Sequence, residues 1–317
     1  MTPIARLKSI PRSVLALAAL AVAGIYFFVT APPDLDDDAA SARTVPVETL
    51  FRMLDAENAS IRAIYTAEIV GPGQKAGLKY HEDWKKRDVH AGPLPALLLR
   101  ETANRLQQRE PDLNLFLGSA FPIEPTNRFK GVQQSYFEKI QRDRKPQFFL
   151  DASTGRYTAM FPDVARAEPC VKCHNGHPKS PRKDWKLDDV MGATTWSFAR
   201  KQVSTDELVE ILAAYRASAI DAYASYVKKT ASFDPAERPE VGARWPADGR
   251  FVPDVDTFRH RVEEKNSIAS LDLLLQLRTA QPVAAPAAGT GAPRTAAMQT
   301  GHAGNAMPTP SKASGTP

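Results

Sequence analysis

The chain has 317 residues, of which 43% are hydrophobic and 24% are charged, and its formal net charge is +5. These values are ordinary for a globular protein and leave room for one large or two modest domains. The Lys and Arg residues are scattered and interleaved with Asp and Glu. This pattern argues against a nucleic-acid-binding protein, which would gather its positive charge on one surface.

The N-terminus carries an apolar segment of membrane length. Residues 1–12 include three basic side chains, whereas the nineteen residues of Ser13–Ala31 include no charged one. Nineteen helical residues span roughly 28 Å, close to the hydrocarbon thickness of about 30 Å. The acidic run Asp34–Asp38 follows, and this charge order favours a cytoplasmic N-terminus. We therefore predict a cytoplasmic segment 1–12 and a transmembrane anchor 13–31 in the inner membrane, with the bulk of the chain in the periplasm.

A cleaved signal peptide is the alternative interpretation, and it would export the same part of the chain. Val29 and Ala31 fit a small-residue cleavage pattern, but Pro32 and Pro33 follow directly and should hinder cleavage. The apolar run is also long for a signal peptide, so we prefer the anchor. The sequence has no second apolar run of membrane length.

Two helices and a strand are expected after the anchor. Residues 32–44 have the composition of a linker, and a long N-terminal helix is predicted over Val45–Val70, where apolar residues recur with helical spacing. The Gly-Pro-Gly tripeptide that follows is expected to end this helix. A second helix is predicted to begin near Pro95 and to end before Pro111. The apolar run Leu113–Phe121 then predicts a strand.

Antiparallel strands are expected in the middle of the chain. A helix is predicted from about Gly131 to Arg142, and two strands are predicted around the turn Asp151–Gly155. A closing strand is predicted over Val190–Phe198. Antiparallel strands flanked by helices argue for an α+β domain over residues 45–200, and the βα repeats of a doubly wound parallel sheet are too few.

A helical C-terminal extension is predicted over residues 201–280. Ser204 followed by Glu207 forms a capping-box pattern ahead of one amphipathic helix, and a last helix is predicted over about Asp256–Arg278. Residues 281–317 consist mainly of Ala, Pro, Gly, Thr and Ser. Such a segment cannot bury enough apolar surface to offset its ordering entropy, so we expect a disordered tail.

Both cysteines of the chain stand in one short motif, Cys170-Val171-Lys172-Cys173-His174. The pattern C-x-x-C-H is the covalent attachment site of c-type haem. Two closely spaced thiols add to the two vinyl groups of the porphyrin, and the imidazole that follows reaches the iron from one face. The sequence therefore predicts one haem c held covalently by Cys170 and Cys173, with His174 as the proximal iron ligand.

Three other interpretations of the motif stay open at this point. A disulfide between Cys170 and Cys173 is compatible with an oxidising compartment. A thioredoxin-like C-x-x-C needs a helix that runs on from its first Cys, and Gly176 and Pro178 argue against such a helix. A zinc site would need two histidines that lie too close to both cysteines for the usual finger spacing.

The ligand on the other face of the iron is undecided. Because both cysteines would be consumed by thioethers, the candidates are Met and His side chains, namely Met53, His81 and Met160, then His90, His177 and Met191. Packing in the core is the simpler role for Met53 and Met160, and a surface position is as plausible for His81. An open position that binds NO or CO is the remaining alternative.

A few other side chains have a conceivable role beside the haem. Four cations could pair with its propionates or stay solvated: Arg128, Arg156, Arg182 and Lys183. Two tryptophans are expected in the core or against the porphyrin face: Trp185 and Trp196.

The segment Pro169–Phe198 resembles a family of c-type haem proteins with a PAS-like fold, whose members show C-x-x-C-H-N-x-H-P followed by an S-P-K-x-D-W-K-like run and a D-V-x-G strand. The stretches Gly92–Glu101 and Phe116–Phe129 resemble the middle section of that family. The resemblance covers roughly residues 45–200 and is most specific in its last thirty. It implies a PAS-like antiparallel sheet flanked by helices, in an exported haem-c sensory domain. Unlike for many members, we expect no second membrane span and no output module in this chain.

The sequence thus predicts a membrane-anchored, periplasm-facing haem-c protein, a redox or diatomic-gas sensor that acts through a partner protein. Its other partners would be the membrane and the cytochrome c maturation machinery, and no nucleic acid. A monohaem electron carrier is the alternative function. We expect no enzymatic activity, because no acid/base constellation that would support a peroxidase surrounds the motif.

Overall fold

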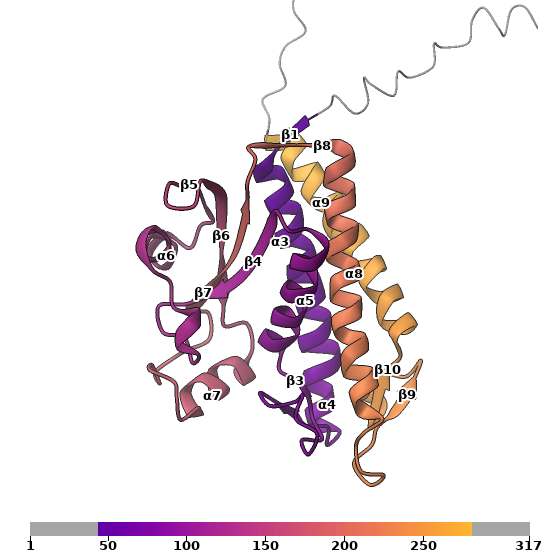
Figure 1. Cartoon of the computed structure of the whole chain (residues 1–317). Helices are drawn as coiled ribbons and strands as arrows, with labels where there is room; N and C mark the ends of the chain where they lie inside the picture. Colours follow the sequence, from indigo (N-terminus) through magenta and orange to yellow (C-terminus); the bar gives the residue numbers. More distant parts are fainter. Residues whose placement is uncertain (1–43, 281–317) are drawn as a thin grey trace, which may run out of the picture. The chain divides into compact units, whose positions relative to one another are not determined.

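The computed structural model describes residues 44–280, which form a mixed α+β fold (Figure 1). The α+β prediction is confirmed, whereas the PAS-like assignment stays a prediction. The predicted segments 1–12 and 13–31, nearly all of the linker and the tail 281–317 lie outside the described residues. Within 44–280, no helix combines the length and the apolar character needed to cross a bilayer.

The centre of the fold is a four-stranded antiparallel sheet with the strand order β4-β7-β6-β5. These strands are β4 (Leu113–Gly118), β5 (Gln147–Asp151), β6 (Arg156–Val164) and β7 (Val190–Phe198). All nine residues of β7 are buried, as expected of a central strand that packs on both faces. The three predicted strand regions are therefore confirmed, and the hairpin β5–β6 turns where the sequence predicted it.

The two faces of the sheet are covered by different helices (Figure 1). On one face, Leu115, Ala159 and Trp196 join the main core with the long N-terminal helix and its neighbours. On the other face, Met160 packs with residues of α6 (Gly131–Asp143). Successive side chains of a strand point to opposite faces, so adjacent residues of β6 enter different clusters.

The long N-terminal helix differs from its prediction at both ends. It begins as α3 (Val47–Ala63), continues as the π-helix η1 (Ile64–Val70) and ends as α4 (Gly71–Lys75), so the Gly-Pro-Gly tripeptide does not stop it. The N–H of Gly71 donates to the carbonyl of Thr66, five residues back. We attribute this wider turn to Pro72, which cannot donate and whose ring would clash with a carbonyl four residues back.

The glycine after Pro72 has a packing role. A Cβ atom at Gly73 would collide with the hydroxyl of Tyr80, which donates to the carbonyl of Ile69 at 3.1 Å. Tyr80 belongs to β2 (Tyr80–His81), which pairs with β3 (Gly92–Pro93). Local sequence preference for a turn is therefore overridden by the packing of this aromatic ring.

Three further helices agree with the sequence. They are α5 (Pro95–Arg109), α8 (Thr205–Thr230) and α9 (Val255–Ala280). The side chain of Ser204 accepts a hydrogen bond of 3.1 Å from the N–H of Glu207, as a capping box requires. The Glu207 carboxylate pairs with Arg200, whose Nη1 donates to Oε2 at 3.0 Å.

The C-terminal helices share the core of the helices before the sheet. Figure 1 shows α8 alongside α3 and α5, and buried residues of α8 such as Tyr215 and Tyr223 belong to the main core. The short strand β8 (Gln202–Ser204) pairs antiparallel with β1 (Thr44–Pro46). Between α8 and α9, β9 (Glu240–Gly242) and β10 (Phe251–Pro253) form a parallel pair.

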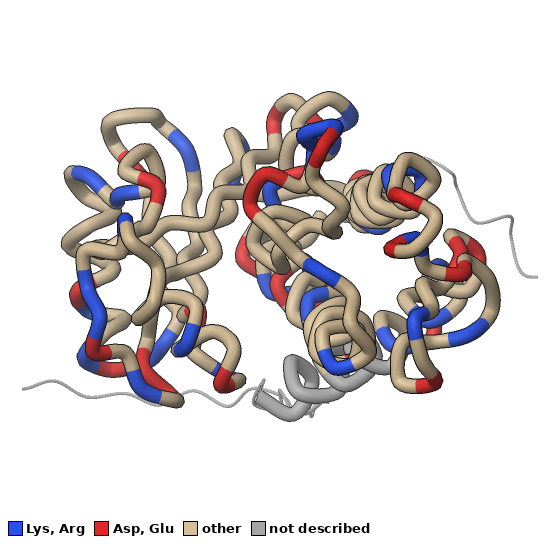
Figure 2. Tube along the Cα trace, turned by 90° about the horizontal axis from the view of Figure 1, so that it is seen from below, with Lys and Arg blue, Asp and Glu red and all other residues tan. Residues whose placement is uncertain are grey.

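A fully buried carboxylate fastens these helices together. Glu57 of α3 is 0% exposed and pairs with Arg216 of α8, whose Nε lies 2.9 Å from Glu57 Oε2. Asn266 and Ser270 of α9 donate further hydrogen bonds to the same carboxylate at 3.4 and 3.3 Å. Because a buried charge is costly unless it is fully paired, this network fixes how the three helices pack. Figure 2 shows Lys and Arg interspersed with Asp and Glu along the described chain.

Candidate functional site

The Cys motif lies on a short helix that the sequence analysis did not predict. This helix, α7 (Glu168–Gly176), has Pro169 in its first turn, where a missing N–H costs nothing. It ends at Gly176, and the N–H of His177 still donates to the carbonyl of Cys173 at 2.9 Å. Residues three apart on a helix share a face, so α7 presents the two cysteines side by side.

The two cysteines differ in their surroundings. Both are free thiols; Cys170 is half-buried and Cys173 is exposed. Cys170 and Val171 pack against a small cluster made by Ala165, Trp185 and Met191. One side of α7 therefore rests on the sheet end, and the second thiol is left open to an incoming group.

Asn175 fixes the end of α7 to the following loop. Its Nδ2 donates to the carbonyl of Trp185 at 2.9 Å, and its Oδ1 accepts from the N–H of the same residue at 2.9 Å. The guanidinium of Arg182 lies 4.0 Å from the centre of the Trp185 ring. These contacts give a structural reason for the Asn in the C-H-N pattern.

His177, whose role the sequence left unexplained, connects α7 to the segment after β2. Its Nδ1 accepts a hydrogen bond of 3.2 Å from the N–H of Lys179. Its Nε2 lies 3.4 Å from Oε2 of Glu82, a residue that sequence reasoning did not single out. The two nitrogens thus close a local turn and reach a neighbouring loop, which leaves no free nitrogen for a metal.

The imidazole of His174 has the state required of an iron ligand. The residue is half-buried, and its Nδ1 is buried without a hydrogen-bond partner. Burial lowers the pKa of His174, against the opposing effect of the Asp163 charge, so the ring is neutral near pH 7. A metal-binding histidine must be neutral, and an orphaned ring nitrogen is what a missing partner group leaves behind.

A charged cluster lies next to His174. Asp163 sits at a β-bulge at the end of β6, a place where strands commonly redirect a side chain. Its Oδ1 lies 2.9 Å from a guanidinium nitrogen of Arg62 on α3. Burial raises the pKa of nearby Asp55 to about 7, with Arg62 lowering it and Asp163 raising it further. The sequence offered no signal for this cluster, because Asp163 is more than 100 residues away from Asp55 and Arg62.

The helix and the thiols of the motif bear on the interpretations that the sequence left open. The helix does run on from Cys170, so the argument from Gly176 and Pro178 against a thioredoxin-like motif was wrong. Partial desolvation of the sulfur, and then the nearby Cys170 and Glu82, raise the pKa of the otherwise accessible Cys173 thiol. The cysteines form no disulfide, and a zinc site would require a thiolate at Cys173, which the raised pKa of this thiol disfavours.

The residues present therefore fit a covalently bound haem. Two thiols one helical turn apart, one of them open, lie beside a neutral imidazole with an unpartnered nitrogen. A cavity of about 240 Å³ lies between the loop that carries Glu82 and one face of α5. Its lining includes Leu97, Arg100 and Glu101. This donor set can take a porphyrin edge and its iron.

The predicted distal ligands lie in different places. Met53 is 7% exposed in the main core, and Met160 is fully buried in the cluster under α6. His81 is exposed, and its Nδ1 accepts from the N–H of Asp83 at 3.0 Å. Among the described residues, none of these three contacts α7. Met191 does pack against Cys170, while His90 is bonded to Glu237.

Two of the four suggested propionate partners are engaged elsewhere. Arg156 donates to the carbonyl of Asp112, and Arg182 pairs with Asp184 at 2.7 Å. Arg128 and Lys183 are exposed and make no ion pair within the described part of the chain. Of the two tryptophans, Trp185 lies by the motif. Trp196 is core, 5.4 Å from the Tyr215 ring.

Comparison with known proteins gives one match. The family model described as Tll0287-like (Tll0287) matches residues 40–199, which is just over half of the 317 residues. Neither the curated proteins nor the solved structures include a match to this chain.

Proposed function

The chain belongs to the Tll0287-like family, and from the geometry of α7 we propose that it binds one haem c covalently. Cys170 and Cys173 form the thioethers, and His174 binds the iron from one face. The observation that carries this proposal is the arrangement of two free thiols and a neutral imidazole with an orphaned Nδ1 on one short helix.

When bound, a haem supplies an iron whose oxidation state and ligation respond to redox partners or to diatomic gases. The chain's own residues hold and orient it. Asn175 keeps the end of α7 against Trp185, and His177 ties it to Glu82. Asp163, held by Arg62, sets the charge beside the ring of His174.

We further propose that the protein is a sensory module anchored in the inner membrane by residues 13–31, with its body in the periplasm. Helix α3 carries Arg62 toward Asp163, and one and a half turns earlier it carries Glu57 toward α8 and α9. A change of charge at the iron would act on the first contact, and the second joins the same helix to the C-terminal helices. A partner protein that docks on those helices would read the change.

Absorption spectra of the purified protein test the haem. The pyridine haemochrome spectrum of the wild type is expected to show two saturated vinyl groups, and that of Cys173→Ser is expected to show one. A wild-type spectrum of haem with both vinyl groups intact would refute the covalent attachment. His174→Ala, which keeps both thiols, should retain the pigment and change its ligand-field spectrum.

The sensory role has its own test. Spectra with NO and CO in both oxidation states are expected to show that at least one state binds a gas. A haem that stays six-coordinate and ignores both gases in both states would exclude gas sensing. Rapid electron exchange with quinol- or cytochrome-linked partners would then favour the electron carrier instead.

A further inference from the structure

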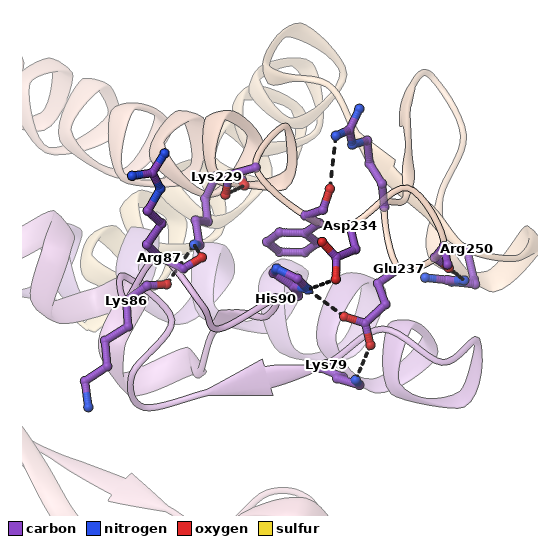
Figure 3. A network of polar contacts seen from close by, with 12 residues as sticks. Lys79, Lys86, Arg87, His90, Lys229, Asp234, Glu237 and Arg250 are labelled. Atoms are coloured by element: carbon purple, nitrogen blue, oxygen red, sulfur yellow. Dashed lines mark hydrogen bonds and ion pairs between the residues drawn. The ribbon is translucent and has the colours of Figure 1, made fainter.

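A second group of ligand-type side chains lies away from α7, between the loop that joins β2 to β3 and the turn after α8. His90 Nδ1 lies 2.7 Å from Oε2 of Glu237 and 3.6 Å from Oδ2 of Asp234. Taken together, one donor atom from each residue lies within 4.8 Å of the others. Figure 3 shows the imidazole directed between the two carboxylates. We propose that His90, Asp234 and Glu237 bind a zinc ion, with water completing the coordination.

The donor set selects this class of metal. One imidazole and two carboxylates suit zinc, whereas calcium and magnesium prefer oxygen ligands throughout. Bonds of about 2.0–2.2 Å in a tetrahedron place donor atoms roughly 3.3–3.5 Å apart. The two distances from His90 Nδ1, 2.7 and 3.6 Å, lie on either side of that range. A shift of under an ångström therefore brings the two distances from His90 Nδ1 into the tetrahedral range.

The imidazole of His90 is held in place by its surroundings, and the two carboxylates stand on a hydrogen-bonded turn. The ring of His90 stacks on Phe233 with centroids 5.5 Å apart and planes at 30°, and its side chain is only 16% exposed. Asp234 and Glu237 stand on one turn, in which the N–H of Glu237 donates to the carbonyl of Asp234 at 2.9 Å. A site whose ligands are already oriented loses less freedom when the metal binds.

The backbone on both sides is pinned as well. Lys229, near the end of α8, donates to the carbonyls of Lys86 and Arg87 at 2.8 and 3.3 Å. Arg250 donates to the carbonyl of Ala236 at 2.8 Å. In Figure 3 these cations point to main-chain oxygens, so they leave the carboxylates of Asp234 and Glu237 to other partners.

The charge balance of the group favours a cation. Lys79 pairs with Oε1 of Glu237, so two carboxylates face one ammonium and a histidine. If Glu237 bound zinc through Oε2, Lys79 would keep its contact with Oε1 and orient the carboxylate from outside the coordination shell. The buried carboxylate of Glu57 is not a comparable metal ligand, because Arg216 already neutralises its charge.

A metal here would fasten two distant parts of the chain. His90 and Glu237 are 147 residues apart. The loop that carries His90 also carries Glu82, which contacts His177 at the end of α7. Zinc would thus hold the turn after α8 to the loop beside the proposed haem helix.

The test is a titration of the haem-loaded full chain with zinc chloride at pH 7.5, followed by calorimetry and by a count of zinc and iron after dialysis. We expect one zinc per chain at this site. His90→Gln should abolish that uptake, and Asp234→Asn and Glu237→Gln should each weaken it at least tenfold. The matched control is His260→Gln, since His260 lies 3.8 Å from Glu263 in an exposed pair. It should bind as the wild type does.

Circular dichroism of each variant shows whether it is folded, and the haem spectrum is a separate readout that does not depend on zinc. Equal zinc uptake by the wild type and His90→Gln would overturn the proposal, and so would no uptake by the wild type. A stability change in His90→Gln that depends on pH and not on zinc would identify a protonation-dependent clasp and overturn it too.

Discussion

The substitution Asn175→Ala tests how α7 is held. It removes two hydrogen bonds of 2.9 Å between the Asn175 side chain and the backbone of Trp185. Each such bond contributes about 0.5–1.5 kcal/mol, so the pair contributes about 2 kcal/mol to the closed position of α7. Because 1.4 kcal/mol is about tenfold in an equilibrium constant, local opening should become roughly 30-fold more frequent.

Hydrogen exchange followed by mass spectrometry measures this opening. Peptides that cover residues 168–189 should lose protection about 30-fold in Asn175→Ala. Asn175→Asp keeps the acceptor for the Trp185 N–H and loses the donor, so its loss should be intermediate. Asn104→Ala is the control, because Asn104 is an exposed residue of α5. Protection within twofold of the wild type in Asn175→Ala would refute the reasoning that this side chain positions α7.

Three further predictions concern the scaffold. Glu57→Gln should lower the free energy of unfolding by about 2–3 kcal/mol in urea titrations, because it weakens a buried charged pair; the double variant with Arg216→Met should be less destabilised than the sum of both single variants. Ser204→Ala should cost about 1 kcal/mol through loss of the helix cap, with Ser232→Ala near neutral as a control. The pKa of Asp55 is about 7 in the folded state and 3.8 in the unfolded state. Between these values the folded state binds one proton more than the unfolded state, so the stability that this proton contributes is lost as the pH rises from 4 to 8. Asp55→Asn should therefore match the wild type at pH 4 and exceed its stability by about 2 kcal/mol at pH 8; equal stability at both pH values would contradict the buried carboxyl.

Much of the fold could be predicted, because most of its helices and strands have a recognisable local pattern of apolar residues. Helical spacing of apolar residues marked α5 and α8, and the β-prone runs marked β4 and β7. The predicted end of the long helix was wrong. The helix continues past Val70 because a π-helix accommodates Pro72 and because Tyr80 packs over Gly73, and neither effect is visible in the local sequence. Gly and Pro disfavour a helix only locally, and tertiary packing can override that preference.

The candidate site was predictable in its chemistry and not in its setting. The spacing of Cys170, Cys173 and His174 is itself the signal for haem. Helix α7 was missed because nine residues with a Gly at the end offer too little periodicity. Contacts such as Arg62 with Asp163 join segments that are far apart in the sequence. No local pattern records such pairs, so only the folded chain reveals what surrounds the imidazole.

The central claim is that Cys170 and Cys173 carry one haem covalently, and the mass of the denatured protein tests it most directly. The wild type, produced in cells with a cytochrome c maturation system and measured under denaturing conditions, should exceed the polypeptide mass by that of one haem. The double variant Cys170→Ser/Cys173→Ser should show the polypeptide mass alone. A wild-type mass without the added haem, in a preparation that matures a known c-type cytochrome, would contradict the account.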